Sequence, residues 1–201
     1  MIHANGNKIC AIDVETTGLD YKKNDIIEIA VVPLDYNLEP DPNYAPFWLD
    51  MAPQKFDNID YSFIRKNKID HLQRNGFDPY VALDIFIEWI ERLELPIGKR
   101  IMPLAQNWVF DRAFIMEWMG SESFNFYIDG RYRDLMSLSL FINDSDDFHN
   151  QPCHFAKNKL SYICCQLNLE CERELFHGAQ YDAVKTAEAY RKLCIMTKCF
   201  Q

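Results

Sequence analysis

The chain has 201 residues, of which 48% are hydrophobic and 25% charged, a composition typical of a globular domain rather than a disordered or fibrous chain. With 21 Lys and Arg against 30 Asp and Glu, its formal net charge of −9 disfavours a protein that binds nucleic acid by simple electrostatic attraction. It has no run of about 18 apolar residues and no export leader, so we expect a cytoplasmic protein without a membrane segment and with free thiols.

Three apolar stretches near the start of the chain predict strands. Residues 8–14 and 26–32 are rich in β-branched and other apolar side chains, and Pro33 marks the end of the second stretch. Their closeness predicts an antiparallel hairpin, and residues 47–51 supply a third candidate strand between two prolines. We therefore expect the sheet to begin as an antiparallel meander.

The rest of the chain combines predicted helices with one further strand. Helical spacing of apolar side chains marks residues 80–95, 110–119, 160–167 and 181–196. A short buried strand is predicted at residues 101–105, where Pro103 favours an edge or irregular position. The polar stretch 143–152 is expected to be a loop. These elements predict a single domain over residues 1–201, with an α/β fold whose mixed sheet is flanked by helices.

Asp13 and Glu15 are the first residues that indicate chemistry. They stand two apart at the end of the first predicted strand, so their side chains project from the same face. Two adjacent carboxylates repel each other and stay ionised only beside a cation, and hard divalent ions take such oxygen ligands. In so acidic a chain the bare tripeptide is a weak signal, and a polar strand end explains it more readily.

The longer string Asp13-Val14-Glu15-Thr16-Thr17-Gly18-Leu19 closely resembles the first motif of the DEDDh family of 3′–5′ exonucleases, which have a ribonuclease H-like fold. Residues 107–114 and 177–183 match the second and third motifs, in the family's order. The third motif has His177 five residues before Asp182. The sister group of this family instead has a tyrosine four residues before that Asp, where this chain has Gly178. The resemblance spans roughly residues 8–196 and implies the same fold and activity for this chain.

The resemblance also implies roles for single residues. The implied ligands of two divalent ions, Mg²⁺ or Mn²⁺, are Asp13, Glu15, Asp111 and Asp182. Two such ions neutralise the four carboxylates where a phosphate must bind. His177 is expected to take the proton from the attacking water. The implied substrate contacts are Thr16, Thr17, Gly18, Leu19 and Asn107. The structural alternative for residues 16–19 is a tight turn that ends the strand, and for Asn107 it is a turn-capping role. At position 106 this chain has Gln106 where many members of the family have histidine.

Three other charged features receive a structural interpretation. The basic stretches 65–68 and 131–133 are interpreted as solvated faces in preference to nucleic-acid contacts. Glu28, in the second predicted strand, is interpreted as a structural residue that at most supports the metal ligands.

The leading hypothesis is a metal-dependent exonuclease that releases 5′-monophosphates from the 3′ ends of single-stranded nucleic acid. DNA is slightly favoured, because the third motif resembles that of the family's proofreading branch, and proofreading would require a polymerase or other replication protein as partner. The alternative is an exoribonuclease that trims RNA ends or degrades short oligoribonucleotides. A catalytically silent binding module and a nucleotide phosphatase are less favoured. No membrane partner is expected, and the oligomeric state stays open.

Overall fold

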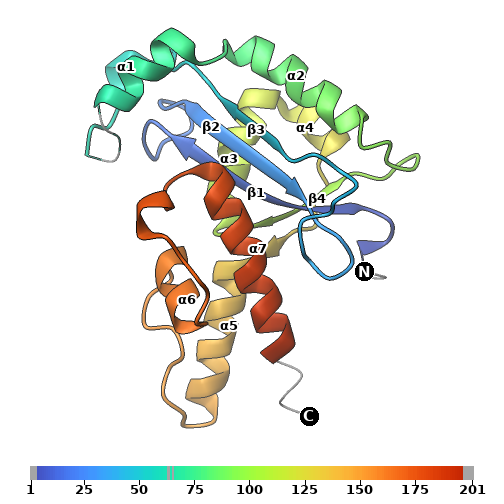
Figure 1. The fold of residues 1–201 in the computed structure, drawn as a ribbon, viewed down its shortest axis with the longest axis vertical. Coiled ribbons are helices and arrows are strands. Elements are labelled where there is room, and N and C mark those ends of the chain that lie inside the picture. The colour runs from blue at the N-terminus through green and yellow to red at the C-terminus, as the bar shows by residue number, and fades with distance from the viewer. Residues whose placement is uncertain (1–3, 63, 65, 197–201) are drawn as a thin grey trace.

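Five strands form one mixed sheet in the order β3-β2-β1-β4-β5 (Figure 1). The strands are β1 Lys8–Thr16, β2 Ile26–Pro33, β3 Phe47–Asp50, β4 Ile101–Ala105 and β5 Arg133–Asp134. β2 is antiparallel to β1 and to β3, which confirms the meander, whereas β4 is parallel to both β1 and β5. The structure is a computed structural model that describes residues 4–62, 64 and 66–196. Cys199 and Arg65 lie outside these residues.

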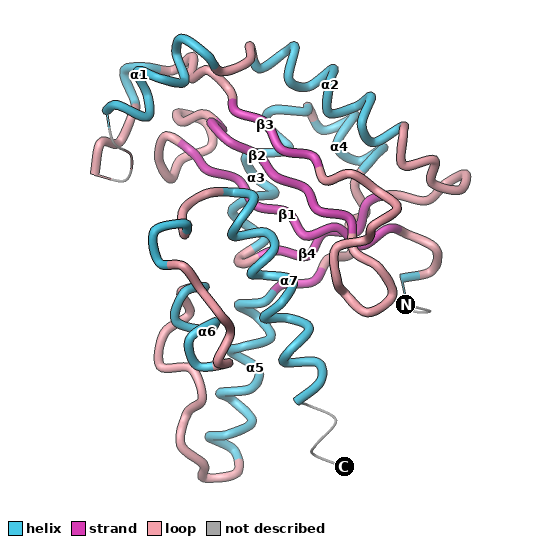
Figure 2. The backbone as a smooth tube through the Cα atoms, viewed as in Figure 1, coloured by secondary structure: helices cyan, strands magenta, loops and turns pink. Residues whose placement is uncertain are grey.

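The helices, drawn in cyan in Figure 2, surround this sheet. They are α1 Lys66–Asn75, α2 Pro79–Glu91, α3 Trp108–Met119, α4 Ser121–Tyr127, α5 Leu135–Phe148, α6 Leu160–Gln166 and α7 Ala179–Met196, with short 3-10 turns at η2 Phe56–Asn58 and η3 Arg173–Leu175. None of the helices described is long and apolar enough to cross a membrane.

Alternation along β1 divides the core between the two faces of the sheet. Cys10, Ile12 and Val14 pack with side chains of α2, α3 and α4. Ile9 and Ala11 point to the opposite face and pack beneath α7, which crosses the sheet in Figure 1. α7 can approach closely because it presents small side chains at helical spacing there, Ala179, Ala183 and Ala187.

All four predicted helices are present, but the first is shorter than expected. α2 starts after Asp78, whose side chain accepts the N–H of Tyr80 at 2.9 Å, with Pro79 in the first turn. It ends at Glu91, not at residue 95, because Glu94 takes a positive φ of 47° that no right-handed helix can continue through.

The predicted edge position of Pro103 is wrong, because β4 lies between β1 and β5. The carbonyl of Arg100 faces β1 and accepts the N–H of Lys8. The carbonyl of Ile101 faces the opposite side, where β5 lies, and accepts the N–H of Asp129. Pro103 has the same orientation as Ile101, so its nitrogen faces the β5 side. β5 pairs only with residues 104 and 105, so the missing N–H of Pro103 interrupts no ladder bond.

The predicted loop at residues 143–152 is also wrong in its first part, since α5 continues to Phe148. The polar side chains there have partners that a helix places correctly. Asn143 exchanges two hydrogen bonds with the backbone of Phe155, at 2.8 and 2.9 Å. Asp146 accepts the N–H of His154 at 3.1 Å. The polar stretch therefore ends a helix whose side chains bind the following loop. The helices α1, α4 and α5 were not predicted.

Candidate active site

Asp13 and Glu15 lie at the carboxyl end of β1, on the face of the sheet that α7 covers. Ile9 and Ala11 precede them on the same row and pack in the core beneath α7. Because side chains alternate along a strand, Asp13 and Glu15 continue that row, while Val14 joins the core of the opposite face. The two carboxylates therefore share one face, as their spacing predicts.

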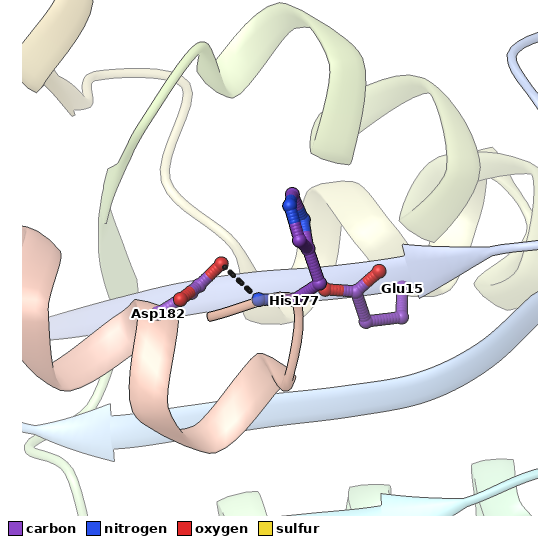
Figure 3. Close-up of side chains that lie close together, drawn as sticks. All are labelled: Glu15, His177 and Asp182. Carbon is purple, nitrogen blue, oxygen red and sulfur yellow. Dashed lines mark hydrogen bonds between the residues drawn. The ribbon is translucent and has the colours of Figure 1, made fainter. Parts of the chain in front are cut away.

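The loop before α7 brings a histidine and another aspartate to this face. The helix begins at Ala179, whose N–H donates to Oε1 of Glu28 at 2.9 Å. The N–H of His177 donates to Oδ2 of Asp182 at 3.2 Å, the dashed line of Figure 3. His177 has a φ of 70°, a left-handed conformation in which histidine is enriched among non-glycine residues. The first bond holds the start of α7 against β2, and the second holds the His177 loop against α7.

Glu15, His177 and Asp182 come close enough to bind one ion (Figure 3). A carboxylate oxygen of each acid and a ring nitrogen of His177 all lie within 4.8 Å of one another. Asp182 is only 8% exposed, whereas His177 is exposed to solvent. The cluster therefore combines a buried carboxylate with an open side that a substrate can reach.

Asp111 reaches the same strand end from the opposite layer. It lies in the first turn of α3, is 3% exposed, and accepts the N–H of Val14 on its Oδ1 at 3.1 Å. Because Val14 stands between Asp13 and Glu15, this bond places the Asp111 carboxylate beside both. α3 follows β4, which is parallel to β1, so the site lies at the carboxyl ends of two parallel strands. Sheets of α/β proteins commonly bind ligands at that edge.

The four carboxylates resist ionisation in the folded protein. Burial raises the pKa of Asp13 well above its ordinary value, and the nearby charge of Asp111 raises it further. Burial also raises the pKa of Glu15 to about 7 and that of Asp182 to about 6. The pKa of Asp111 is raised by burial as well, against the lowering effect of the Val14 hydrogen bond. Such a group of like charges needs a cation to stay ionised at neutral pH.

A divalent cation fits this set of donors. Oδ1 of Asp182 is buried and has no hydrogen-bond partner among the described residues, although buried polar atoms are nearly always paired. Mg²⁺ and Mn²⁺ prefer carboxylate oxygens. Asp13, Glu15, Asp111 and Asp182 therefore have the chemistry of a divalent-metal site, and His177 stands beside it.

Glu28 and Lys68 support this site in a way that the motifs do not reveal. Glu28 is 7% exposed, and besides Ala179 its Oε1 accepts Nε1–H of Trp48 at 3.0 Å. Its Oε2 pairs with Nζ of Lys68 at 3.1 Å. The interpretation of residues 65–68 as a solvated face is therefore wrong for Lys68. The sequence offered one signal for this ion pair. Glu28 is a single acid in an otherwise apolar strand, and a buried carboxylate requires partners.

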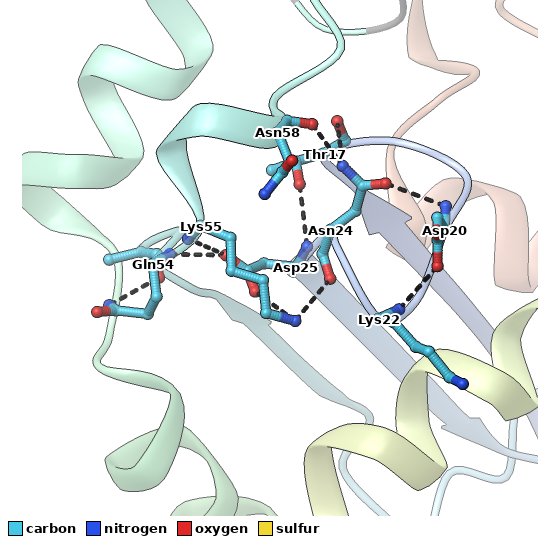
Figure 4. A network of polar contacts seen from close by, with 9 residues as sticks. Thr17, Asp20, Lys22, Asn24, Asp25, Gln54, Lys55 and Asn58 are labelled. Atoms are coloured by element: carbon cyan, nitrogen blue, oxygen red, sulfur yellow. Dashed lines mark hydrogen bonds and ion pairs between the residues drawn. The ribbon is translucent and has the colours of Figure 1, made fainter.

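The turn after β1 is tied to the segment around η2 by a network of hydrogen bonds (Figure 4). Thr17 is fully buried, and its Oγ1 accepts the N–H of Asp25 at 2.9 Å. Nδ2 of Asn24 donates to the carbonyl of Asn58 at 2.6 Å. A Cβ added to Gly18 would lie 2.6 Å from the Asn24 side chain, so any larger residue would have to displace Asn24. The side chain of Thr17 thus stabilises the turn.

The other members of this turn differ in exposure. Leu19 is 66% exposed, so its side chain is available to a substrate. Thr16 is partly exposed, and its Oγ1 donates to the carbonyl of Gly18 at 2.7 Å. The contacts of Thr16, Thr17, Gly18 and Leu19 with a terminal nucleotide stay predictions.

Asn107 stands at the junction of β4 and α3 with a left-handed φ of 68°. Its side chain makes no capping hydrogen bond within the described part of the chain. Asp134 caps the helix instead by accepting the N–H of Trp108 on Oδ2 at 2.5 Å. The side chain of Gln106 does not cap the helix either; its Nε2 donates to the carbonyl of Asn158 at 2.6 Å. The substrate contact expected of Asn107 stays a prediction, whereas the neighbouring Trp108 is buried in the core.

Residues 10–190 match the model of the exonuclease family RNase_T. Ribonuclease T of Wigglesworthia glossinidia brevipalpis is 27% identical over 190 residues, which cover 89% of this chain and 80% of that protein. A probable oligoribonuclease of Drosophila melanogaster is 27% identical over 113 residues, which cover 54% of this chain and 52% of that protein.

Solved structures share the fold at lower sequence identity. Cell-death related nuclease 4 (CRN-4) aligns with a TM-score of 0.66 at 18% identity, over 94% of this chain and 64% of that chain. S. pombe Pop2p, in an Mg²⁺- and Mn²⁺-bound form, aligns with a TM-score of 0.59 at 14% identity, over 92% of this chain and 82% of that one. At these identities the likeness shows the ribonuclease H-like fold alone.

Proposed function

Because this chain belongs to the RNase_T family of exonucleases, the DEDDh 3′–5′ hydrolytic nucleases, we propose that its substrate is the 3′ end of single-stranded RNA. The two curated relatives above are named as ribonucleases, which supports RNA trimming over the DNA activity that the third motif favoured. The hydrolytic chemistry itself is supported by one observation, the convergence of Glu15, His177 and Asp182 beside two further carboxylates, Asp13 and Asp111.

The ions that this site would hold are two divalent cations, Mg²⁺ or Mn²⁺, with Asp13, Glu15, Asp111 and Asp182 as ligands. When bound, such ions neutralise charge at the attacked phosphate and lower the pKa of water. The protein's own contribution is to hold four carboxylates together in spite of their repulsion. The backbone N–H groups of Val14 and His177 keep Asp111 and Asp182 in place.

His177 is assigned as the general base. Its imidazole lies beside the carboxylates on an exposed loop, so a ring nitrogen can accept a proton from the attacking water and pass it to solvent. Glu28 holds the start of α7 through Ala179 and thereby orients this loop. The attack breaks the bond between phosphorus and the 3′ oxygen of the upstream nucleotide, so the product is a 5′-monophosphate.

The turn after β1 is assigned to the terminal nucleotide. Leu19 offers an exposed apolar side chain on which the last base can pack. Thr16 and the backbone of Gly18 would approach the terminal sugar, since glycine has no side chain to obstruct it. The network in Figure 4 keeps this turn in one conformation before substrate arrives.

The test is a time course with two 5′-labelled single strands of identical sequence, one RNA and one DNA, each with Mg²⁺, with Mn²⁺ and with EDTA. We expect a ladder that shortens from the 3′ end only with metal, and faster for RNA. Asp13→Asn is expected to lose more than about a hundredfold in rate, since the variant lacks a carboxylate at the metal site. Faster cleavage of DNA would contradict the proposed substrate, and intact strands in both metals would contradict the enzyme assignment.

A further inference from the structure

A groove of about 790 Å³ opens beside α6, and His177 forms part of its wall. The rest of the wall comes from residues 157–159, from α6, and from residues 168–176, the segment that leads back to α7 in Figure 1. His177 belongs to the carboxylate cluster as well, so the groove is continuous with the active site. The volume is within the range of sites that hold small organic ligands, about 300–1,000 Å³.

This groove, which we call the α6 groove, is positively charged in an acidic protein. Lys157, Lys159 and Arg173 line it and are exposed, and among its described lining residues Glu170 is the one acid. None of the three cations forms an ion pair with any residue that the structure describes. Three exposed cations that form no ion pair among the described residues, although Glu172 and Glu174 flank Arg173 in the sequence, favour an anionic ligand in this groove.

Two aromatic rings line the same groove. Tyr162 and Phe176 line the groove and are partly exposed. Nζ of Lys157 lies 6.0 Å from the centroid of the Tyr162 ring. Cations together with aromatic rings are typical of surfaces that bind single-stranded nucleic acid, because cations contact phosphates and rings stack on bases.

The wall that carries Phe176 is held in place before any ligand binds. Its ring packs edge-on against Tyr181 of α7, with centroids 5.2 Å apart. The hydroxyl of Tyr181 accepts the N–H of Glu172 at 2.7 Å. α7 therefore fixes both the groove wall and Asp182, and the two sites keep a constant relative position.

We propose that the α6 groove binds the substrate strand on the 5′ side of the nucleotide that is removed. This inference rests on the proposed function, since the strand is taken to have its 3′ end among the carboxylates and to pass His177 into the groove. Lys157, Lys159 and Arg173 contact successive phosphates, and Tyr162 stacks on a base. The cations of the groove thus attract RNA, whereas the net negative charge of the protein as a whole repels it.

The test compares two RNA substrates, a single strand of about twelve nucleotides, long enough to fill the groove, and a dinucleotide that is too short to reach it. The variant combines Lys157→Ala, Lys159→Ala and Arg173→Ala. A matched control removes three exposed cations elsewhere, with Arg92→Ala, Arg100→Ala and Lys192→Ala.

We expect the groove variant to lose at least about tenfold in kcat/KM on the long strand, through KM, and to equal wild type on the dinucleotide. Loss of three phosphate contacts should make the slope of log kcat/KM against log salt shallower by about 2. Between about 50 and 200 mM salt, wild type should therefore lose about twentyfold more activity than the variant. The control should behave as wild type on both substrates.

Equal activity of the groove variant and wild type on the long strand, or equal loss on both substrates, would overturn the proposal. Failure of the wild-type protein to cleave either substrate would instead overturn the proposed function. Stacking is tested separately by Tyr162→Ala, expected to lose about tenfold on the long strand, against Tyr162→Phe, which keeps the ring and should match wild type. Equal losses in these two variants would exclude a stacking role for Tyr162.

Discussion

The carboxylate cluster should make the metal-free protein less stable than a variant with one acid fewer. Asp182→Asn tests this, since it keeps the shape of the side chain and removes the charge. The pKa of Asp182 is about 6 instead of 3.8, mainly because of burial. This difference of about 2 corresponds to about 3 kcal/mol at 1.36 kcal/mol per unit. The amide also retains an oxygen that can accept the N–H of His177.

The pH dependence follows from the direction of this change. A carboxyl whose pKa is raised by folding lowers the stability of the fold once it ionises, so the cost grows as pH rises from about 4 to about 6. Above pH 6 the full difference of about 3 kcal/mol should be present, and below pH 4 the two proteins should be equally stable. In a domain of this size that difference raises Tm by about 6–12 °C.

The assay is thermal unfolding followed by circular dichroism in EDTA at pH 4, 5, 6 and 7.5, for wild type and for Asp182→Asn. Asp144→Asn, an exposed substitution on α5, removes the same charge far from the cluster and should leave Tm almost unchanged. Addition of Mg²⁺ or Mn²⁺ at pH 7.5 should raise the Tm of wild type more than that of Asp182→Asn, which keeps three of the four carboxylates. A lower Tm for Asp182→Asn at pH 7.5 in EDTA, or a difference that does not depend on pH, would refute the reasoning.

Two further predictions concern residues that support the site. Glu28→Ala should lower the free energy of unfolding by about 1–3 kcal/mol, because the N–H groups of Ala179 and Trp48 lose their acceptor. It should also lower kcat, and normal kcat in a folded Glu28→Ala protein would exclude a role for Glu28 in orienting the His177 loop. Gly18→Ala should cost about 1–3 kcal/mol, since the new methyl group displaces Asn24 from its hydrogen bonds. Gly130→Ala is the matched control, because no atom of the described residues lies within 4 Å of the added Cβ, and equal Tm values for these two glycine variants would contradict the steric argument.

The sequence by itself determined the elements whose signal is local. Alternation placed Asp13 and Glu15 on one face of β1, and apolar runs located β1, β2 and β3 within a residue or two. The three ordered motifs indicated the family, because the spacing of chemically required residues within each motif is written in adjacent positions of the chain.

Only the tertiary structure decided which distant residues meet. Asp111 joins the cluster from the opposite layer because β4 runs parallel to β1, and no local pattern encodes that pairing. The pairing of Glu28 with Lys68, 40 residues apart, has the same origin. Pro103 sits inside the sheet because its neighbour β5 is only two residues long. In each case the deciding energy comes from a contact between separate elements, which hydropathy and residue preference along the chain do not contain.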